Sequence, residues 1–285
     1  MLRAQLRAFL LSAATLAVLA VPCSNLAAQE QPGNVPETKA PPAAASAPAD
    51  TSSAPLTLTV TLPSWQQGAS WLEQDRQLLS DFGDLEHFHA ADMKLGPPAS
   101  HENRVVFMGD SITSGWHLDQ SFPGKPYINR GISGQTTPQM LLRFRQDVIE
   151  LHPRVVVILG GTNDVAQNTG PISPEQIEGD IVSMAELARA NGIVPVICSI
   201  PPAAAFWWHH GMEPAPIIAA INEWLKNYAA QHHYVYVDYY DAMKDAQGGL
   251  PPNLSRDGVH PGPAGHAVMG PLVQAGIEEA MKSSE

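Results

Sequence analysis

The stretch Arg104–Trp116, RVVFMGDSITSGW, carries the strongest structural signal in the 285-residue chain. Four apolar residues, Val105 to Met108, run directly into Gly-Asp-Ser. A short run that is apolar throughout is typical of a strand covered on both faces, as in a parallel sheet. The turn after it would place the Ser111 hydroxyl at the carboxyl end of that strand, where open parallel sheets bind ligands. Ser111 is either a turn residue or a nucleophile. The second interpretation requires catalytic partners elsewhere in the chain.

Similar apolar runs recur along the chain, separated by helical patterns. The strand candidates are VVVILG at 155–160, IVPVICSI at 193–200, YVYVD at 234–238 and, more weakly, YIN at 127–129. The helical patterns cover about 137–150, 174–190, 217–228 and 264–281. Strands that alternate with helices predict an α/β fold with a parallel sheet between layers of helices.

Two of these helices have readable starts. Ser173 and Gln176 form a capping box, and Asn191-Gly192 is a typical helix stop. Thr137 is the predicted N-cap of the earlier helix, with Pro138 at its first position.

Residues 1–28 predict a signal peptide, because a positive start is followed by the 13-residue apolar run Phe9–Val21 and then by small residues. A lipid anchor at Cys23 is the disfavoured alternative, since Pro22 stands where a small residue is expected. No other apolar stretch is long enough for a membrane span. We therefore expect a secreted or periplasmic protein without stable membrane insertion.

Residues 29–56 are rich in Pro, Ala and Ser and lack aromatics, which predicts a disordered linker. The domain would occupy 57–285. It would begin with a short edge strand at 56–62 and a helical extension at 64–95, broken at Gly83.

Charge and cysteine content exclude some function classes. Removal of the signal peptide changes the formal net charge from −12 to −14, which disfavours binding to nucleic acid. Cys198 is then the single cysteine, so no internal disulfide can form, and its apolar surroundings predict an inert core thiol.

A serine nucleophile needs a base, and the base needs an orienting group. The segment RDGVHPGPAGH near the C-terminus offers Asp257 and His260, three residues apart on a predicted tight loop. Acyl transfer also needs donors for the oxyanion. Asn163, after the run at 155–160, could supply one, and Gly131 or Gly134, after the weak strand, another.

The segments GDSITSG, GISGQTT, GGTND and DGVHP resemble, in this order, the four sequence blocks of the GDSL/SGNH hydrolase superfamily, over residues 105–270. The resemblance implies a three-layer α/β/α, flavodoxin-like fold. It implies Ser111 as nucleophile, with Asp257 and His260 completing the triad. The implied oxyanion donors are the Ser111 N–H, Gly134 and Asn163, and Gly134 is preferred to its neighbour because GQTT matches the second block.

Two other enzyme classes fit the sequence less well. An α/β-hydrolase elbow needs Gly-x-Ser-x-Gly, and Thr113 breaks that motif. The pairs His209-His210 and His232-His233 invite a metal site, but adjacent histidines seldom bind one ion and no HExxH motif is present. We expect neither a metal nor a cofactor.

Four residues are candidate substrate contacts: Asp110, Trp116, Trp207 and Trp208. The segment FWWHHGMEP at 206–214 is either a wall of the substrate site or a loop packed on the surface. A structural role for Asp110 and a core position for Trp116 remain open alternatives.

The sequence thus predicts a serine esterase that acts on short-chain carboxylic esters, with O-acetyl groups on carbohydrates as the first substrate class. A lipid or lysophospholipid esterase and an acyltransferase would use the same residues. A carbohydrate-binding protein with an inactive site is the alternative outside enzymes. The expected partner is a small-molecule or carbohydrate ester, and the oligomeric state is open.

Overall fold

The structure, a computed structural model, describes residue 76 and residues 79–283. The predicted signal peptide, linker and edge strand lie outside the described residues, as does most of the predicted helix before Gly83. In the part of the chain that is described, no helix combines the length and the apolar character that crossing a membrane requires.

Five parallel strands form a single sheet in the order β2-β1-β3-β4-β5, which confirms the predicted α/β class. The strands are β1 (Val105–Gly109), β2 (Tyr127–Gly131), β3 (Val155–Leu159), β4 (Val194–Cys198) and β5 (Val235–Val237). The strand order reverses between β1 and β3, and an open α/β sheet binds ligands at the carboxyl ends of strands around such a point. Ser111 follows β1, and Asn163 follows β3.

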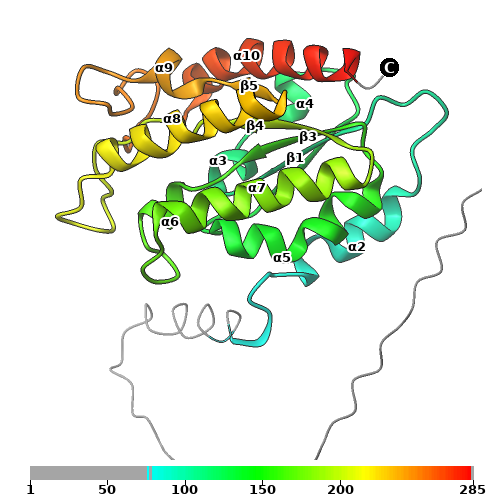
Figure 1. Ribbon diagram of the computed structural model, residues 1–285, viewed down its shortest axis with the longest axis horizontal. Coiled ribbons are helices and arrows are strands. Elements are labelled where there is room, and N and C mark those ends of the chain that lie inside the picture. Colours follow the sequence, from blue (N-terminus) through cyan, green and yellow to red (C-terminus); the bar gives the residue numbers. More distant parts are fainter. Residues whose placement is uncertain (1–75, 77–78, 284–285) are drawn as a thin grey trace, which may run out of the picture. The chain divides into compact units, whose positions relative to one another are not determined.

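Helices cover both faces of the sheet, so the fold has the three α/β/α layers (Figure 1). One layer contains α5 (Thr137–Asp147), α7 (Pro174–Ala190) and α8 (Pro214–His232), and the other contains α10 (Pro263–Lys282) with the short helices α3 (Ser111–Ser114), α4 (Leu118–Ser121) and α9 (Tyr239–Met243). Alternate β1 residues face the two cores: Val106 and Met108 pack toward α5 and α7, and Val105 and Phe107 toward α10. Burial on both faces explains why the strand runs are apolar throughout.

The helix ends agree with the predictions only in part. The capping box of Ser173 and Gln176 begins α7 as expected. The cap of α5 is Thr136, not Thr137, because the Thr136 N–H donates to the Gln139 side chain at 3.0 Å. The helix expected to reach residue 150 ends at Asp147 and is followed by a 3₁₀ turn over 149–151.

Helix α8 is longer than predicted, since it begins at Pro214. A proline in the first turn is compatible with a helix, because the first N–H groups have no partner within the helix.

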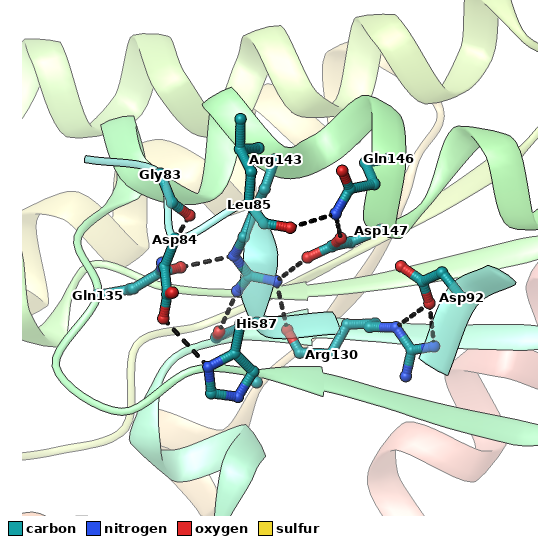
Figure 2. Close-up of polar contacts among 12 residues, drawn as sticks. Gly83, Asp84, Leu85, His87, Asp92, Arg130, Gln135, Arg143, Gln146 and Asp147 are labelled. Carbon is teal, nitrogen blue, oxygen red and sulfur yellow. Dashed lines mark hydrogen bonds and ion pairs between the residues drawn. The ribbon is translucent and has the colours of Figure 1, made fainter. Parts of the chain in front are cut away.

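The described part of the predicted N-terminal extension packs against α5. The chain turns around Gly83 and continues as α2 (Glu86–Leu95). Three backbone carbonyls of this segment accept hydrogen bonds from α5 and the loop before it, at 2.6–3.0 Å. These pairs are Phe82 with Gln139, Gly83 with Gln135, and Leu85 with Gln146. The last two appear at the top of Figure 2.

Candidate active site

Ser111 stands at the start of α3, directly after the end of β1. Asp110 is the N-cap of this short helix, and its Oδ1 accepts the Ile112 N–H at 2.9 Å. A side chain at this cap satisfies an N–H that the helix itself cannot pair. The Asp-Ser sequence after β1 is therefore what turns the chain and leaves the Ser111 hydroxyl at the carboxyl edge of the sheet.

A close approach of β2 to α3 fixes this turn from the side. A Cβ on Gly131 would lie 2.8 Å from the Asp110 carbonyl and closer still to the backbone of Thr113 and Ser114. Only glycine allows β2 to pack this near to the α3 backbone. The Gly131 N–H is already occupied, because it donates to Asn129 Oδ1 at 2.8 Å.

His260 reaches Ser111 from the loop before α10, 149 residues further along the chain. Its Nε2 lies 2.9 Å from Ser111 Oγ, and its Nδ1 lies 2.7 Å from Asp257 Oδ2. An ionised carboxylate can only accept, so Nδ1 carries the ring hydrogen and Nε2 is free to accept from the hydroxyl. The structure thus joins the three residues in one hydrogen-bonded chain.

The conformation of this loop comes from contacts within it. Asp257 Oδ1 accepts from the His260 N–H at 2.8 Å, the Val259 N–H at 3.0 Å and the Ser255 hydroxyl at 3.0 Å. Burial alone would raise the pKa of Asp257, but the hydrogen bonds from His260 and Val259 outweigh it and hold that pKa well below its usual range. Asp257 therefore stays charged and keeps the imidazole oriented.

The loop from Ile132 to Thr136, which we call the oxyanion loop, lies beyond β2. The Gln135 N–H donates to the Ile132 carbonyl at 3.3 Å, and Gly134, inside this turn, has a φ of +82°. Glycine adopts this conformation without the cost that a side chain would add. Neither the Gly134 N–H nor the Ser111 N–H donates to any residue that the structure describes.

Asn163 lies in α6 (Thr162–Val165), immediately after β3, and is buried. Its Nδ2 donates to the Gln135 carbonyl at 3.0 Å and to Asp110 Oδ2 at 3.3 Å. Its Oδ1 accepts from Asn168 Nδ2 at 2.8 Å. The structure therefore brings Asn163 against both the oxyanion loop and the serine turn, with its amide nitrogen on that side.

Two buried carboxyl groups lie behind the serine. Burial raises the pKa of Asp110 to about 7, although the Ile112 N–H opposes the shift. Burial also raises the pKa of Asp164 to about 6, against the hydrogen bonds that it accepts from the Thr137 hydroxyl and N–H. Each of these groups holds a proton more tightly in the fold than an exposed aspartate does.

Arg143 in α5 supports the site from beneath and has no exposed surface. Its guanidinium donates to the Gly109 and Arg130 carbonyls, to Gln135 Oε1 and to Asp147 Oδ2, at 2.6–2.9 Å. Figure 2 shows Arg143 between Gln135 and Asp147. One buried cation thus ties together the ends of β1 and β2 and the oxyanion loop. This role of Arg143 was not predicted from the sequence, although an Arg–Asp pair four residues apart between apolar positions was a usable signal.

The aromatic loop, Phe206–Met212, lies beside the histidine. The Trp208 ring centroid is 6.5 Å from that of His260, and its Nε1–H donates to Asn168 Oδ1 at 2.9 Å. Trp207 packs edge-on against Trp208 and is 62% exposed.

Two predicted substrate contacts lie in the interior instead. Trp116 is 2% exposed and stacks on His266 with ring centroids 5.0 Å apart, and its Nε1–H donates to Ser121. Asp110 is 1% exposed and caps α3. Neither side chain is open to a substrate, because one fills the core beside α10 and the other is enclosed by the serine turn.

The histidine pairs do not form a metal site with other described residues. No group of three or more His, Cys, Asp or Glu side chains within residues 79–283 is arranged to hold an ion. The His209 Nδ1 instead pairs with the Ala166 carbonyl at 2.8 Å, which holds the aromatic loop against the loop after α6.

Comparison with known proteins identifies the family. The model of the GDSL-like lipase/acylhydrolase family matches residues 107–268, which is more than half of the chain. A solved GDSL-like lipase from Bacteroides thetaiotaomicron has 41% sequence identity and a TM-score of 0.68, over 70% of this chain and 99% of that one.

Two curated relatives match shorter regions. The uncharacterized lipoprotein YqeF of Bacillus subtilis is 30% identical over 41% of this chain, and the match covers 58% of the relative's own length. An acetylxylan esterase from Geobacillus stearothermophilus is 28% identical over 50% of this chain and 67% of its own.

Proposed function

This chain belongs to the GDSL-like lipase/acylhydrolase family and is a carboxylic ester hydrolase, and from that premise we propose that it removes short acyl groups through Ser111, His260 and Asp257. The observation that carries the proposal is the hydrogen-bonded chain from Ser111 Oγ to His260 to Asp257, at 2.9 and 2.7 Å. These distances are those of a nucleophile in reach of its base and of a base in reach of its orienting group.

The reaction proceeds in two halves. Ser111 Oγ attacks the ester carbonyl carbon while His260 Nε2 takes the hydroxyl proton, and the resulting imidazolium is stabilised by Asp257. The carbon–oxygen bond to the alcohol then breaks, and the alcohol leaves with that proton. Water attacks the acyl-Ser111 carbonyl with His260 again as base, which releases the acid and restores the serine.

Three donors would hold the oxyanion: the N–H groups of Ser111 and Gly134 and the amide of Asn163. The first two N–H groups have no acceptor among the described residues, which supports this role because they are available to a substrate oxygen. Asn163 Nδ2 donates two hydrogen bonds, and the one to Asp110 is longer than the one to the Gln135 carbonyl. A substrate oxygen would therefore compete with Asp110 for its Nδ2 hydrogen.

Gly131, the other glycine considered for this role, fits it less well. Its N–H already donates to Asn129, and it lies where β2 packs against α3. Gly131 is therefore assigned to packing in this proposal.

We assign the substrate to the acylated carbohydrates, with O-acetyl as the acyl group. The exposed indole of Trp207 beside Trp208 and His260 supports this, because aromatic faces pack against the apolar faces of sugar rings. The acetylxylan esterase among the relatives points the same way. A lipid ester, the competing substrate, would be favoured by activity that rises with acyl chain length.

We also propose that the protein is exported and acts in the periplasm or outside the cell. The support is the composition of residues 1–28 together with the lipoprotein among the relatives. Cleavage near Ala28 would appear as a mature N-terminus at residue 29 in the exported protein. A lipid-modified Cys23 would contradict cleavage at that point but would still be consistent with export.

The test is hydrolysis of p-nitrophenyl esters of increasing chain length, beside acetate release from acetylated xylan. We expect the acetyl ester to be the best small substrate and Ser111→Ala to lose hydrolysis by about 10⁶-fold, because the remaining donors cannot replace the nucleophile. A fluorophosphonate should label the wild type and not the variant. Full hydrolysis by Ser111→Ala would overturn the assignment of the nucleophile.

A further inference from the structure

A line of hydrogen bonds links the aromatic loop to the oxyanion loop. The Trp208 Nε1–H donates to Asn168 Oδ1 at 2.9 Å, and Asn168 Nδ2 donates to Asn163 Oδ1 at 2.8 Å. Asn163 Nδ2 then donates to the Gln135 carbonyl at 3.0 Å. We call Trp208, Asn168 and Asn163 the amide relay. Its members come from the loop after β4, the loop after α6 and α6 itself.

The hydrogen-bonded line begins at the Trp208 indole N–H and ends at the Gln135 carbonyl, and these two groups have fixed polarity, whereas the two asparagine amides between them do not. An indole N–H can only donate, and a backbone carbonyl can only accept. A side-chain amide can present either its oxygen or its nitrogen to a neighbour. If Asn168 reversed, its nitrogen would face the indole N–H and its oxygen would face Asn163 Oδ1. The indole therefore selects one orientation of Asn168. Asn168 in turn reinforces the orientation of Asn163 that the Gln135 carbonyl and Asp110 Oδ2 also favour.

Asn168 is held close to Asn163 by its backbone as well. The Asn168 N–H donates to the Asn163 carbonyl at 3.0 Å. The next residue, Thr169, has its hydroxyl 3.2 Å from that of Thr136 in the oxyanion loop. Asn168 itself is exposed, so water competes for its hydrogen bonds and the expected effect is moderate.

We propose that Asn168 is a positioning residue, which turns the Asn163 amide with its nitrogen toward the oxyanion loop and couples this orientation to Trp208. The inference rests on the proposed function, because it assigns to Asn163 the role of oxyanion donor. The amide relay joins the aromatic wall of the site to the oxyanion donor, so that movement of the aromatic loop changes how well Asn163 is aligned.

The first test is Asn168→Asp, which keeps the size of the side chain and removes its donor. The carboxylate still accepts from Trp208 but places an oxygen against Asn163 Oδ1. We expect kcat for p-nitrophenyl acetate to fall about tenfold, with KM within about twofold, because the oxyanion develops only in the transition state. Gln167→Asp is the matched control, since it adds the same charge one residue away and should leave kcat unchanged.

The second test is Trp208→Phe, which keeps an aromatic ring and removes the indole N–H. Without that donor the Asn168 amide is free to reverse, so kcat should fall by about threefold while KM for p-nitrophenyl acetate changes little. Because this variant adds no charge, it remains a test if Asn168→Asp does not fold.

The deciding experiment is a double-mutant cycle with Asn163→Ala. If Asn168 acts through Asn163, then Asn168→Asp or Trp208→Phe lowers kcat in the wild type and has no further effect in Asn163→Ala. If each substitution lowers kcat by the same factor in Asn163→Ala as in the wild type, the proposal is overturned and Asn168 only stabilises its loop. An unchanged kcat in both single variants would overturn it too.

The proposal and the function on which it rests fail in different ways. Loss of hydrolysis in Ser111→Ala, measured in the same assay, tests the function alone. If that loss is seen and the effects of the two substitutions on kcat multiply in the double variant, the esterase assignment stands and only the role of Asn168 is wrong. If Ser111→Ala hydrolyses esters as the wild type does, the proposed function fails whatever the cycle shows.

Discussion

The serine side and the histidine side of the site are built in opposite ways. Ser111 lies on a turn that is fixed by distant parts of the chain, namely Gly131 on β2, Arg143 on α5 and Asn163 on α6. The loop of Asp257 and His260 is held mainly by hydrogen bonds within residues 251–262.

Exposure follows the same division. Asp110 and Arg143, on the serine side, are buried, whereas the side chains of His260 and Asp257 are 39% and 36% exposed. The comparison teaches that alignment of the proposed nucleophile, Ser111, depends on the global fold, while alignment of the proposed base, His260, depends on a short local motif. Changes on the serine side should therefore cost stability, and changes in the histidine loop should cost activity with little loss of stability.

Asp257→Asn should give the largest effect and test the histidine side. An amide at this position would place an N–H against His260 Nδ1, so the ring would carry its hydrogen on Nε2 and could not accept the Ser111 proton. We expect kcat to fall by about 10⁴-fold, as is usual when a triad carboxylate becomes an amide. The free energy of unfolding in urea should change by only about 1 kcal/mol, because the pair is exposed. A variant that unfolds, or one that retains most of its kcat, would contradict the division.

Arg143→Met tests the serine side. Removal of the guanidinium leaves Asp147 as an unpaired buried charge and leaves several acceptors without donors. We expect a loss of about 3–5 kcal/mol in the free energy of unfolding. The double variant Arg143→Met/Asp147→Met should recover part of this loss, since no charge is then buried. Unchanged stability of the single variant would show that the network is dispensable.

Gly131→Ala and Gly134→Ala form a matched pair on the two glycines of the oxyanion loop region. An added methyl at 131 meets backbone atoms of α3, and we expect it to cost about 1–3 kcal/mol of stability and to displace Ser111. At 134 it meets nothing within 4 Å and adds only the strain of φ +82°, about 1–2 kcal/mol. Urea unfolding and kcat/KM should both rank Gly131→Ala as the worse variant. If Gly134→Ala were the worse variant, the close packing of β2 against α3 at Gly131 would matter less for stability and activity than the backbone conformation of Gly134.

The pH dependence of stability should give the smallest effect. Burial raises the pKa of Asp110 to about 7 and that of Asp164 to about 6, so the folded state keeps protons that the unfolded chain releases near pH 4. Stability therefore falls as pH rises from about 4 to 7. The lowered pKa of Asp257 acts in the other direction: its contribution is present above the unfolded pKa and is lost as pH falls through the folded one.

The measurement compares urea midpoints of the wild type and Asp110→Asn at pH 5 and pH 8. The midpoint of the wild type should drop more over this range, because only the wild type must ionise a buried carboxyl at position 110. His266, whose pKa burial lowers, opposes the drop equally in both proteins. If the urea midpoint of Asp110→Asn drops as much as that of the wild type, or more, a group other than Asp110 causes the pH dependence.

Much of the fold was predictable because its signals are short-range. Burial on both faces makes the β1 and β3 runs apolar throughout, and the cap of α7 lies within four residues. The turn of Asp110 and Ser111 and the loop of Asp257 and His260 are likewise stretches of two to four residues. Their alternatives, a plain turn and a capping histidine, could be weighed only through the ordered set of four blocks.

The sequence by itself thus determined the strands, the order of the motifs and the residues able to form a serine centre, since each depends on neighbours along the chain. Only the tertiary structure decided that, among the described residues, the Gly134 N–H has no acceptor while that of Gly131 has one, that Trp116 lies in the core, and that Arg143 and Asn168 donate hydrogen bonds to Gly109 and Asn163. These outcomes depend on which distant segments pack together. Burial, free donors and the direction of hydrogen bonds are properties of those tertiary contacts, so the sequence alone does not contain them.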